Sequence, residues 1–456
     1  MIVPQPRLLF WFALIVLPFS VLGLVYADGQ LWSMALIAGL LIIAAVDATR
    51  ALGKLKGLSV ELPPILRFSK ERPGSIAVTV RHARQEPFTF RLGLPLPSDL
   101  RAEREEAILQ LPPGVEASSV SWTCHPLRRG QFRLSRAFLE IASGLGLWAL
   151  RGSVPVQCEI RVYPNLSRER KGLAALFLNR GAFGIHAQRM VGKGRDFEKL
   201  REYIPGDSFD EIHWKATAKR GHPVTKIFQI ERTQEIYIII DASRLSARRP
   251  ARDNETGPSS TVTDAPSEAA ILERFITSAL VLAQAAEKQG DLFGLLTFTD
   301  QVGTFLRAKN GQQHYAACRD ALYTLEATNV APDFDEIVSF IRTRLRRRAL
   351  LMFLTSLDDP MLAESFTRNM ALLAGQHLVL VNMILPPAVS PLFVRADVTQ
   401  LDDLYRHLGG HLQWHRLQEL QRVLQHRGVR FSLLENERMA TELVSQYLGV
   451  KQRQLI

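Results

Sequence analysis

The chain has 456 residues, 47% of them hydrophobic and 22% charged, and a formal net charge of +11. This length and apolar content suffice for two or three domains with real cores. The positive charge would suit nucleic acid or an anionic membrane surface, but no nucleic-acid-binding module accompanies it. The cysteines exclude a disulfide framework and a cysteine metal site, because they are odd in number and far apart: Cys124, Cys158 and Cys318.

Two apolar runs open the sequence. Residues 8–27 have the length that crosses a bilayer core, and residues 31–48 form a second run after a polar break at residues 28–30. We predict a transmembrane helical hairpin within residues 1–50. A cleaved signal peptide is the alternative, but its basic region would hold only Arg7, no A-x-A cleavage site is present, and a second apolar segment follows at once.

Flanking charges predict the orientation of this hairpin. The short loop between the runs carries Asp28 and no base, whereas several bases follow the second run: Arg50, Lys54, Lys56, Arg67, Lys70 and Arg72. Because cytoplasmic flanks of membrane helices carry the excess of lysine and arginine, both termini should face the cytoplasm. We therefore expect a two-pass protein of the bacterial plasma (inner) membrane, bound to the lipid bilayer, with the bulk of the chain in the cytoplasm.

Residues 58–165 change in pattern. Short stretches rich in β-branched and aromatic residues alternate with prolines and glycines: Ser75–Val80, Phe88–Leu92, Val120–Thr123, Phe132–Leu134 and Ile160–Tyr163. Many short strands separated by turn residues predict a small β-sandwich domain. Trp122 and Trp148 suit core or interdomain packing better than ligand binding.

A connector and an unusually ordered stretch occupy residues 166–235. Within it, residues 192–233 combine charged, aromatic and turn residues and lead into an apolar strand. Three of its residues recur at helical steps of three, which favours a helix: Phe197, Leu200 and Tyr203. A turn follows at Pro205-Gly206-Asp207. A second packed segment should then begin, with Ile212, Trp214, Ala216 and Ala218.

This stretch resembles the core motif of the family called domain of unknown function 58 (DUF58). The matching words are GKGRDFEKLREYIPGDS, IHWKATAKRG and the strand ending IIIDAS, and the earlier words RRGQFRL and SGLGLW also look like this family. Asp210 and Lys219 depart from the usual motif, which has arginine at both places. The resemblance carries over to Gly194, Arg195, Leu200, Arg201, Tyr203, Pro205, Gly206, Asp207, Ile212, Trp214, Lys215 and Ala218.

The resemblance implies architecture and partners rather than a reaction. It implies a membrane-associated bacterial protein with a von Willebrand factor A-like domain, of a kind often encoded beside MoxR-type AAA+ ATPases. No reaction is established for the family, so the resemblance implies an ATPase partner and no catalytic residues.

Residues 236–456 alternate between predicted strands and amphipathic helices. The predicted strands are Ile236–Asp241, Asp291–Thr299, Gln301–Arg307, Ala349–Thr355, His377–Leu385 and Val429–Leu434, the third of them added through a hairpin. The predicted helices are Glu268–Gln289, Gln312–Leu325, Phe334–Arg346, Leu362–Ala374, Leu412–His426 and Glu437–Leu448. This order predicts an α/β fold, with a parallel sheet covered by helices on both faces, of the von Willebrand factor A-like (Rossmann) type.

An insertion interrupts this alternation at residues 244–266. It is polar, rich in proline, serine and threonine, and nearly free of large apolar groups, so we expect it to be disordered. It directly follows the first strand, at the carboxyl edge of the sheet. It is therefore either a neutral insertion or a segment that covers or regulates a site at that edge.

The candidate metal site follows the first strand of this domain. Von Willebrand factor A-like domains have an acid and two hydroxyls there in the pattern D-x-S-x-S, which bind a divalent cation together with a threonine and an acid from later loops. Asp241 and Ser243 match this pattern, whereas Leu245 replaces the second serine. The later ligands would be Thr328 and Asp358, or Asp359 in its place. Oxygen ligands suit Mg²⁺, but the lost hydroxyl favours a degenerate site without metal.

Catalytic patterns are sparse. Asp207 and His213 could serve a hydrolase, with His222 nearby in sequence, but an acid after Pro-Gly more often caps a helix. No G-x-S-x-G, P-loop or H-E-x-x-H pattern occurs, and the glycines around Lys193 are a weak phosphate signal. The basic run at residues 342–348 suits a helix C-terminus, with an acidic partner or lipid headgroup as the alternative.

The sequence therefore favours a non-enzymatic, membrane-anchored adaptor that recruits a MoxR-type AAA+ ATPase. Two alternatives stay open. A hydrolase would use Asp207 and His213, and would need these side chains clustered in a pocket. A basic nucleic-acid-binding protein would need a continuous positive face.

Overall fold

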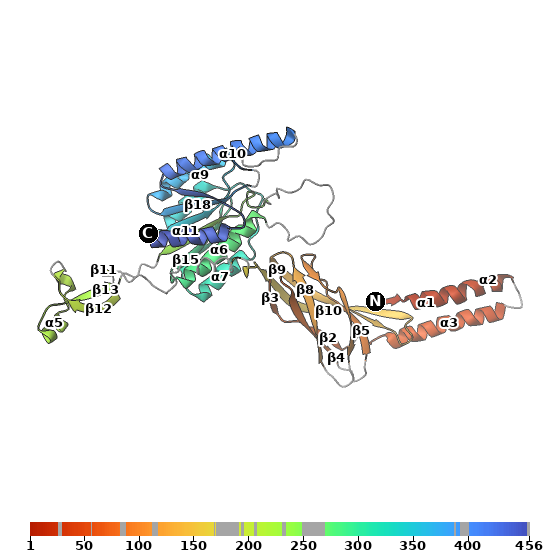
Figure 1. Cartoon of the computed structure of the whole chain (residues 1–456). Coiled ribbons are helices and arrows are strands. Elements are labelled where there is room, and N and C mark those ends of the chain that lie inside the picture. The colour runs from red at the N-terminus through yellow and green to blue at the C-terminus, as the bar shows by residue number, and fades with distance from the viewer. Residues whose placement is uncertain are drawn as a thin grey trace. The chain divides into compact units, whose positions relative to one another are not determined.

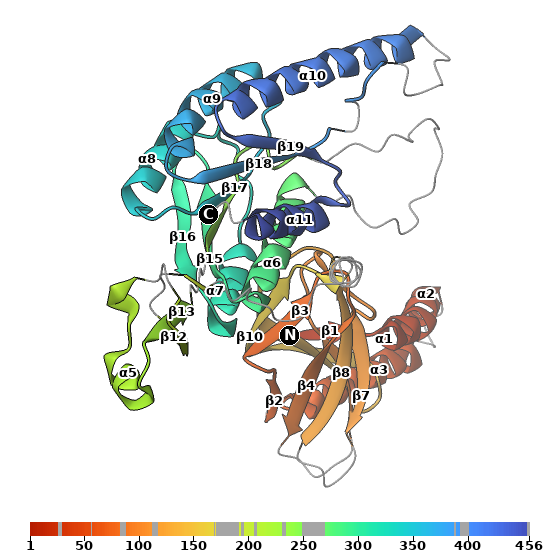
Figure 2. The same cartoon turned by 60° about the vertical axis from the view of Figure 1, so that its left-hand side comes forward.

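The computed structural model divides into two units, Met1–Asn165 and Leu166–Ile456 (Figures 1 and 2). The chain is a mixed α/β protein with an apolar N-terminal helix, and at this level the prediction is confirmed. The structure describes residues 1–25, 30–55, 57–82, 88–111, 117–167, 169, 191–192, 196–204, 208–229, 234–248, 270–386, 389–392 and 401–453.

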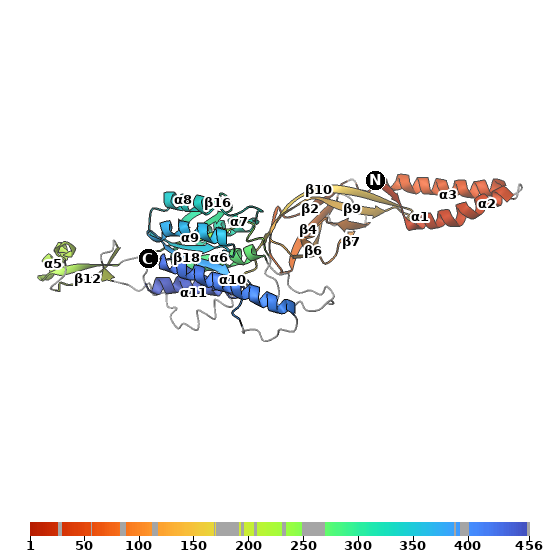
Figure 3. The ribbon, with the colours of Figure 1, turned by 90° about the horizontal axis from the view of Figure 1, so that it is seen from above.

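Apolar helices begin the first unit. A π-helical segment, Phe12–Val16, connects α1 to α2, and α3 runs beside them (Figure 3). Within the described residues, α3 is the one helix that is long and apolar enough to cross a membrane, judged by length and composition. Large apolar side chains on it, such as Leu31 and Trp32, are exposed. The helix bounds are Pro6–Trp11 (α1), Leu17–Val25 (α2) and Gln30–Ala51 (α3).

Two packed β-sheets form the rest of the first unit. One sheet has the order β1-β10-β9-β5-β7 with β3 beside β10, and the other has the order β2-β4-β8-β6. A single apolar core, which includes Trp122, lies among their buried residues. The strands are β1 Ile2–Pro4, β2 Leu58–Glu61, β3 Ile65–Ser69, β4 Gly74–His82, β5 Phe88–Gly93, β6 Leu100–Ala102, β7 Glu106–Leu111, β8 Ala117–Pro126, β9 Gly130–Ala142 and β10 Trp148–Tyr163.

A buried carboxylate joins α3 to the sheets. Asp47 is 3% exposed and accepts hydrogen bonds from the Ser143 hydroxyl at 2.5 Å and from the Leu145 N–H at 3.1 Å, both in the turn between β9 and β10. The Trp148 indole N–H donates to the carbonyl of Ala44 on α3 at 2.8 Å. Because a carboxylate removed from water needs such donors, these bonds fix the end of α3 on the SGLGLW segment.

The family motif forms a small antiparallel sheet with a short helix. The prediction of a helix over Phe197 to Tyr203 is wrong, because Asp196–Glu202 is strand β12 and pairs with β13. Three apolar residues in seven positions do not decide between helix and strand, and pairing with a β-branched neighbour decides the matter. The other elements are β11 Val191–Gly192, the 3₁₀ turn Phe209–Glu211, α5 Trp214–Arg220 and β13 Val224–Gln229.

The second packed segment of the motif is only partly packed. Ile212 is buried, whereas Trp214 is 69% exposed at the first position of α5. No residue of α5 is buried, so the expectation that Trp214, Ala216 and Ala218 pack into a core is wrong. A helix of seven residues on a small sheet offers too little apolar surface to bury a side chain as large as that of tryptophan.

A six-stranded sheet organises the remainder of the second unit. Its order is β16-β15-β14-β17-β18-β19, with every neighbouring pair parallel except the antiparallel hairpin of β15 and β16. The strands are β14 Glu235–Asp241, β15 Leu292–Phe298, β16 Val302–Lys309, β17 Leu350–Leu354, β18 Leu378–Ile384 and β19 Arg430–Leu434. The helices are α6 Ile271–Lys288, α7 Gln312–Leu322, α8 Phe334–Arg344, α9 Pro360–Ala374, α10 Leu401–His426 and α11 Met439–Gln452.

Helices cover both faces of this sheet (Figure 2). Alternate residues of β14 enter two separate apolar cores. Ile236, Ile238 and Ile240 pack on the side of α6, α7 and α11. Tyr237 and Ile239 pack on the side of α8, α9 and α10. Strands buried on both faces require continuous apolar runs, which is why β14 reads as Ile-Tyr-Ile-Ile-Ile.

A buried polar group fixes α11 to the sheet. Asp291, which is 2% exposed, accepts hydrogen bonds from the Tyr447 hydroxyl and from the Lys451 ammonium at 2.7 Å, and its other oxygen accepts from the Gln234 N–H at 3.2 Å. Burial and the adjacent carboxylate raise the pKa of Tyr447 well above its usual range. The tyrosine therefore stays protonated, and so a hydrogen-bond donor, at neutral pH.

We predict that Asp47→Ala loosens the attachment of α3 to the β9–β10 turn. The substitution leaves the Ser143 hydroxyl and the Leu145 N–H without their acceptor, at a cost of about 1–3 kcal/mol. Hydrogen exchange of the solubilised full-length chain should show the Leu145 amide exchanging at least about tenfold faster. Glu106→Ala, which removes an exposed carboxylate of the same unit, should leave that rate unchanged. Equal exchange in wild type and Asp47→Ala would contradict the attachment.

Candidate functional site

The sheet topology places the candidate site at the ends of β14 and β17. The chain leaves β14 toward β15 and β16 on one side, then returns to β17 on the other side. In open α/β sheets, such a reversal of strand order opens a crevice at the carboxyl ends of the strands, where ligands bind. Asp241 ends β14, and Thr355 directly follows β17.

Asp241 is held by hydrogen bonds from both sides of this crevice. It is fully buried, and its carboxylate accepts from the Ser243 N–H at 2.8 Å and from the Thr355 hydroxyl at 2.6 Å. Burial raises the pKa of Asp241, although these hydrogen bonds act in the opposite direction. The side chain therefore bridges two neighbouring strands.

The chain after Asp241 turns sharply and is ordered. The Ser246 hydroxyl donates to the Asp241 carbonyl at 2.6 Å, and the Leu245 side chain is buried. The Arg244 N–H donates to the carbonyl of Val330 at 3.0 Å. The expectation of disorder is therefore wrong for residues 244–248, because they bond to the loop that holds Val330 and to Asp358 after β17. Residues 249–266 lie outside the described part of the chain.

The two later candidate ligands have other partners. The Thr328 N–H donates to the carbonyl of Ala242 at 2.9 Å, so its loop does lie beside β14. Asp358 forms an ion pair with the Arg248 guanidinium. Asp359, the alternative acid, caps α9 by accepting from the Met361 N–H at 3.0 Å.

These donors fit a divalent cation poorly. Both oxygens of Asp241 already accept hydrogen bonds, a buried leucine stands at the position of the second serine, and a guanidinium supplies the positive charge beside Asp358. Within the described residues, no three His, Cys, Asp or Glu side chains gather as a metal cluster. The interpretation of Asp241, Ser243, Thr328 and Asp358 as a degenerate site, rather than one that binds Mg²⁺, stays a prediction.

Of the two residues that the hydrolase alternative would use, only His213 lies within the described part of the chain. His213 caps α5, since its Nδ1 accepts from the Ala216 N–H at 3.0 Å. His222 is exposed and lies 3.5 Å from the Glu202 carboxylate. Asp207 lies outside the described residues, as do Lys193, Gly194, Arg195, Pro205 and Gly206. A ring nitrogen that accepts a backbone hydrogen bond has given up the lone pair that a general base requires.

Three residues of the site escaped the sequence reasoning. Thr355 and Ser246 hold Asp241, and Arg248 pairs with Asp358. A signal existed for Thr355, because it is the first polar residue after the apolar run that forms β17. None existed for Arg248, which stands in a polar segment that predicts disorder.

The fold and site define an α/β sheet domain, in a chain that also carries an apolar helix. Residues 199–392 match the family described as "Protein of unknown function DUF58". The resemblance found from the core motif is confirmed.

Relatives and solved structures add little beyond the family. Uncharacterized proteins of Mycobacterium bovis and Mycobacterium tuberculosis are 22% identical over 210 residues, which cover 45% of this chain and 59% of each relative. The chain thus matches about three fifths of the length of these curated relatives. An aerotolerance-related membrane protein from Bacteroides fragilis is 11% identical over 47% of this chain and 98% of its own, with a TM-score of 0.29, which is too low to support a shared fold.

We predict that Asp241→Asn gains stability relative to wild type as the pH rises. An unfolded aspartate has a pKa of about 3.9, and burial raises the pKa in the folded chain. The folded state therefore binds the proton more tightly, and stability falls as the pH rises through that window. The asparagine keeps the shape of the side chain and can still bond Ser243 and Thr355, but it has no proton to lose.

Unfolding midpoints of the solubilised chain between pH 4 and pH 7 test this. The free energy of unfolding of the variant, minus that of wild type, should rise by about 1.4 kcal/mol for each unit by which the pKa is raised. Gln301→Ala, at an exposed position of the same sheet, removes no titratable group and should show no such trend. A constant difference for Asp241→Asn would show that this carboxyl group titrates alike in the folded and unfolded chain.

Proposed function

We propose that this protein is a non-enzymatic, membrane-anchored adaptor that binds protein partners, among them a MoxR-type AAA+ ATPase. One observation carries the proposal: the two acids at the crevice of the sheet already have partners within the chain. Asp241 bonds to Ser243 and Thr355, and Asp358 pairs with Arg248. Groups that already satisfy one another hold a surface in shape, and they are poorly placed to activate a substrate.

The proposed anchor is a two-pass helical hairpin in the bacterial inner membrane. Helix α3 has the length and composition of a membrane span, and the shorter apolar helices α1 and α2 run beside it. The basic residues after α3 support a cytoplasmic position for both termini and for the sheet domain. The hydrogen bonds of Asp47 would then hold the β-sheets of the first unit at the membrane surface.

The proposed partner rests on the family and on the sheet. The match of residues 199–392 to DUF58 supports a von Willebrand factor A-like domain for residues 236–456, and so does a parallel sheet with one antiparallel end strand. The ATPase would supply work from nucleotide hydrolysis, and this chain would supply location and docking.

Capture of the solubilised full-length chain from its native membrane, with and without Mg²⁺ and ATP, tests the proposal. Mass spectrometry should identify a MoxR-type AAA+ ATPase as the main partner. A chain with both apolar runs removed, captured from the soluble fraction, is the control for the anchor. Repeated capture without any ATPase would contradict the partner, and an activity lost in His213→Ala with the fold retained would favour the hydrolase.

A further inference from the structure

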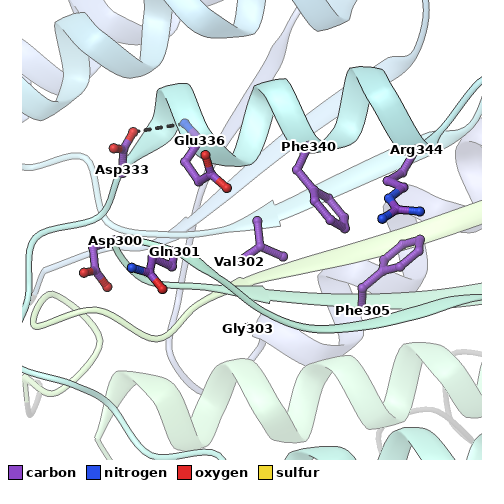
Figure 4. A pocket seen from close by; sticks show the side chains of 9 residues that line it. All are labelled: Asp300, Gln301, Val302, Gly303, Phe305, Asp333, Glu336, Phe340 and Arg344. Atoms are coloured by element: carbon purple, nitrogen blue, oxygen red, sulfur yellow. Dashed lines mark hydrogen bonds between the residues drawn. The ribbon is translucent and has the colours of Figure 1, made fainter.

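An open groove runs along the end of the six-stranded sheet, between β16 and α8 (Figure 4). Its volume is about 690 Å³. Glu336, Phe340 and Arg344 line it from α8, and because they are spaced four residues apart they lie on one flank of the helix. Phe305 of β16 faces them from the strand side.

Strand β16 offers a main-chain edge in this groove. In the described part of the chain, β16 ends the sheet and pairs with β15 alone. A strand at the end of a sheet presents N–H and C=O groups on its outer side that another extended segment can pair with. Its eight residues extend over about 26 Å, at about 3.3 Å for each residue.

The middle of the groove is a supported aromatic surface. The rings of Phe305 and Phe340 meet edge to face at 5.3 Å, and Phe305 stacks on Tyr237 at 6.2 Å. Tyr237 is buried, and its hydroxyl accepts from the Ala308 N–H at 3.2 Å. Gly294 makes room for this ring, since a Cβ there would collide with it. The aromatic pair is therefore held in place from below.

Charge differs between the two ends of the groove. Asp300, Asp333 and Glu336 are exposed at the end near the β15–β16 turn, and no ion pair among the described residues neutralises them. Asp333 uses one oxygen to cap α8. Arg344 lies at the opposite end, with its guanidinium 5.8 Å from the centre of the Phe340 ring. The groove is thus acidic, then aromatic, then basic.

We propose that this groove binds an extended peptide segment of a partner protein, which adds to the sheet beside β16. A basic side chain of the segment would lie at Asp300, Asp333 and Glu336. An apolar side chain would pack on Phe305 and Phe340, and an acidic one would meet Arg344. Main-chain pairing supplies affinity, and the alternating side chains supply the choice of partner. The inference deepens the adaptor function proposed above, on which it rests, by assigning a surface and the chemistry of its ligand.

A second copy of this chain is a poorer occupant than a peptide. Two β16 strands that pair into one antiparallel sheet would bring a second α8 to the same face, over the same groove. One strand fills the space between β16 and α8 without that conflict. A peptide segment from a partner therefore suits the groove better than a dimer does.

Fluorescence polarisation with the solubilised full-length chain tests this. The probes are two fluorescein-labelled peptides, ETFTVTKK and its reverse KKTVTFTE, which cover both pairing directions. Each places its acid, its phenylalanine and one lysine on the same face of an extended strand. One of them should bind with a Kd of about 10–100 µM, and hydrogen exchange should show protected amides in β16. Asp300→Lys should weaken binding about tenfold, whereas Glu364→Lys, at an exposed acid on α9 outside the groove, should not.

A charge-reversed peptide, in which the two lysines become glutamates, separates contact from structure. It should bind Asp300→Lys more tightly than it binds wild type. Three results would overturn the proposal: failure of both lysine peptides to bind, binding that Asp300→Lys and Phe340→Ala leave unchanged, or a dimer in mass photometry that Asp300→Lys abolishes. No ATPase takes part in this assay, so loss of the ATPase partner and loss of peptide binding are separate outcomes.

Discussion

The second unit depends on one constraint, which is that β14 is buried on both faces and yet ends in a carboxylic acid. An acid taken out of water must be neutralised or hydrogen-bonded. Asp241 meets this need with the Ser243 N–H on its own loop and the Thr355 hydroxyl beyond β17. The same bonds fix the turn after β14 and tie together the two strands at which the sheet order reverses.

In the adaptor proposed above, binding of a partner falls to surfaces other than this crevice. Arg248 takes up the charge of Asp358, where a von Willebrand factor A-like domain with bound metal would have a cation. The groove beside β16, by contrast, has exposed charges and a supported aromatic surface. At the other end of the chain, Asp47 performs the corresponding task for α3, since a buried carboxylate there joins helix and sheet. Both carboxylates thus stabilise the structure from within.

Much of the architecture follows from local pattern. The amphipathic repeats of α6 and α8 indicate helices by their apolar period. The continuous apolar run of β14 indicates a strand by its short length and its β-branched residues instead. Where the apolar pattern covered only a few residues, as in β12, pairing with β13 decided the secondary structure. Trp214 was expected to be packed because it is large and apolar, but α5 is too short to bury it. The partners of Asp241 and Asp358, and the groove, depend on contacts far apart in sequence, which periodicity does not reveal.

The most direct test of a closed, metal-independent crevice is a titration of Mn²⁺, read by electron paramagnetic resonance, into the solubilised full-length chain at neutral pH. Mn²⁺ accepts the oxygen ligands that Mg²⁺ uses. The account predicts no saturable site in wild type and the same weak background in Asp241→Ala. One ion bound for each chain, and lost in Asp241→Ala, would contradict it and restore Asp241 as a metal ligand.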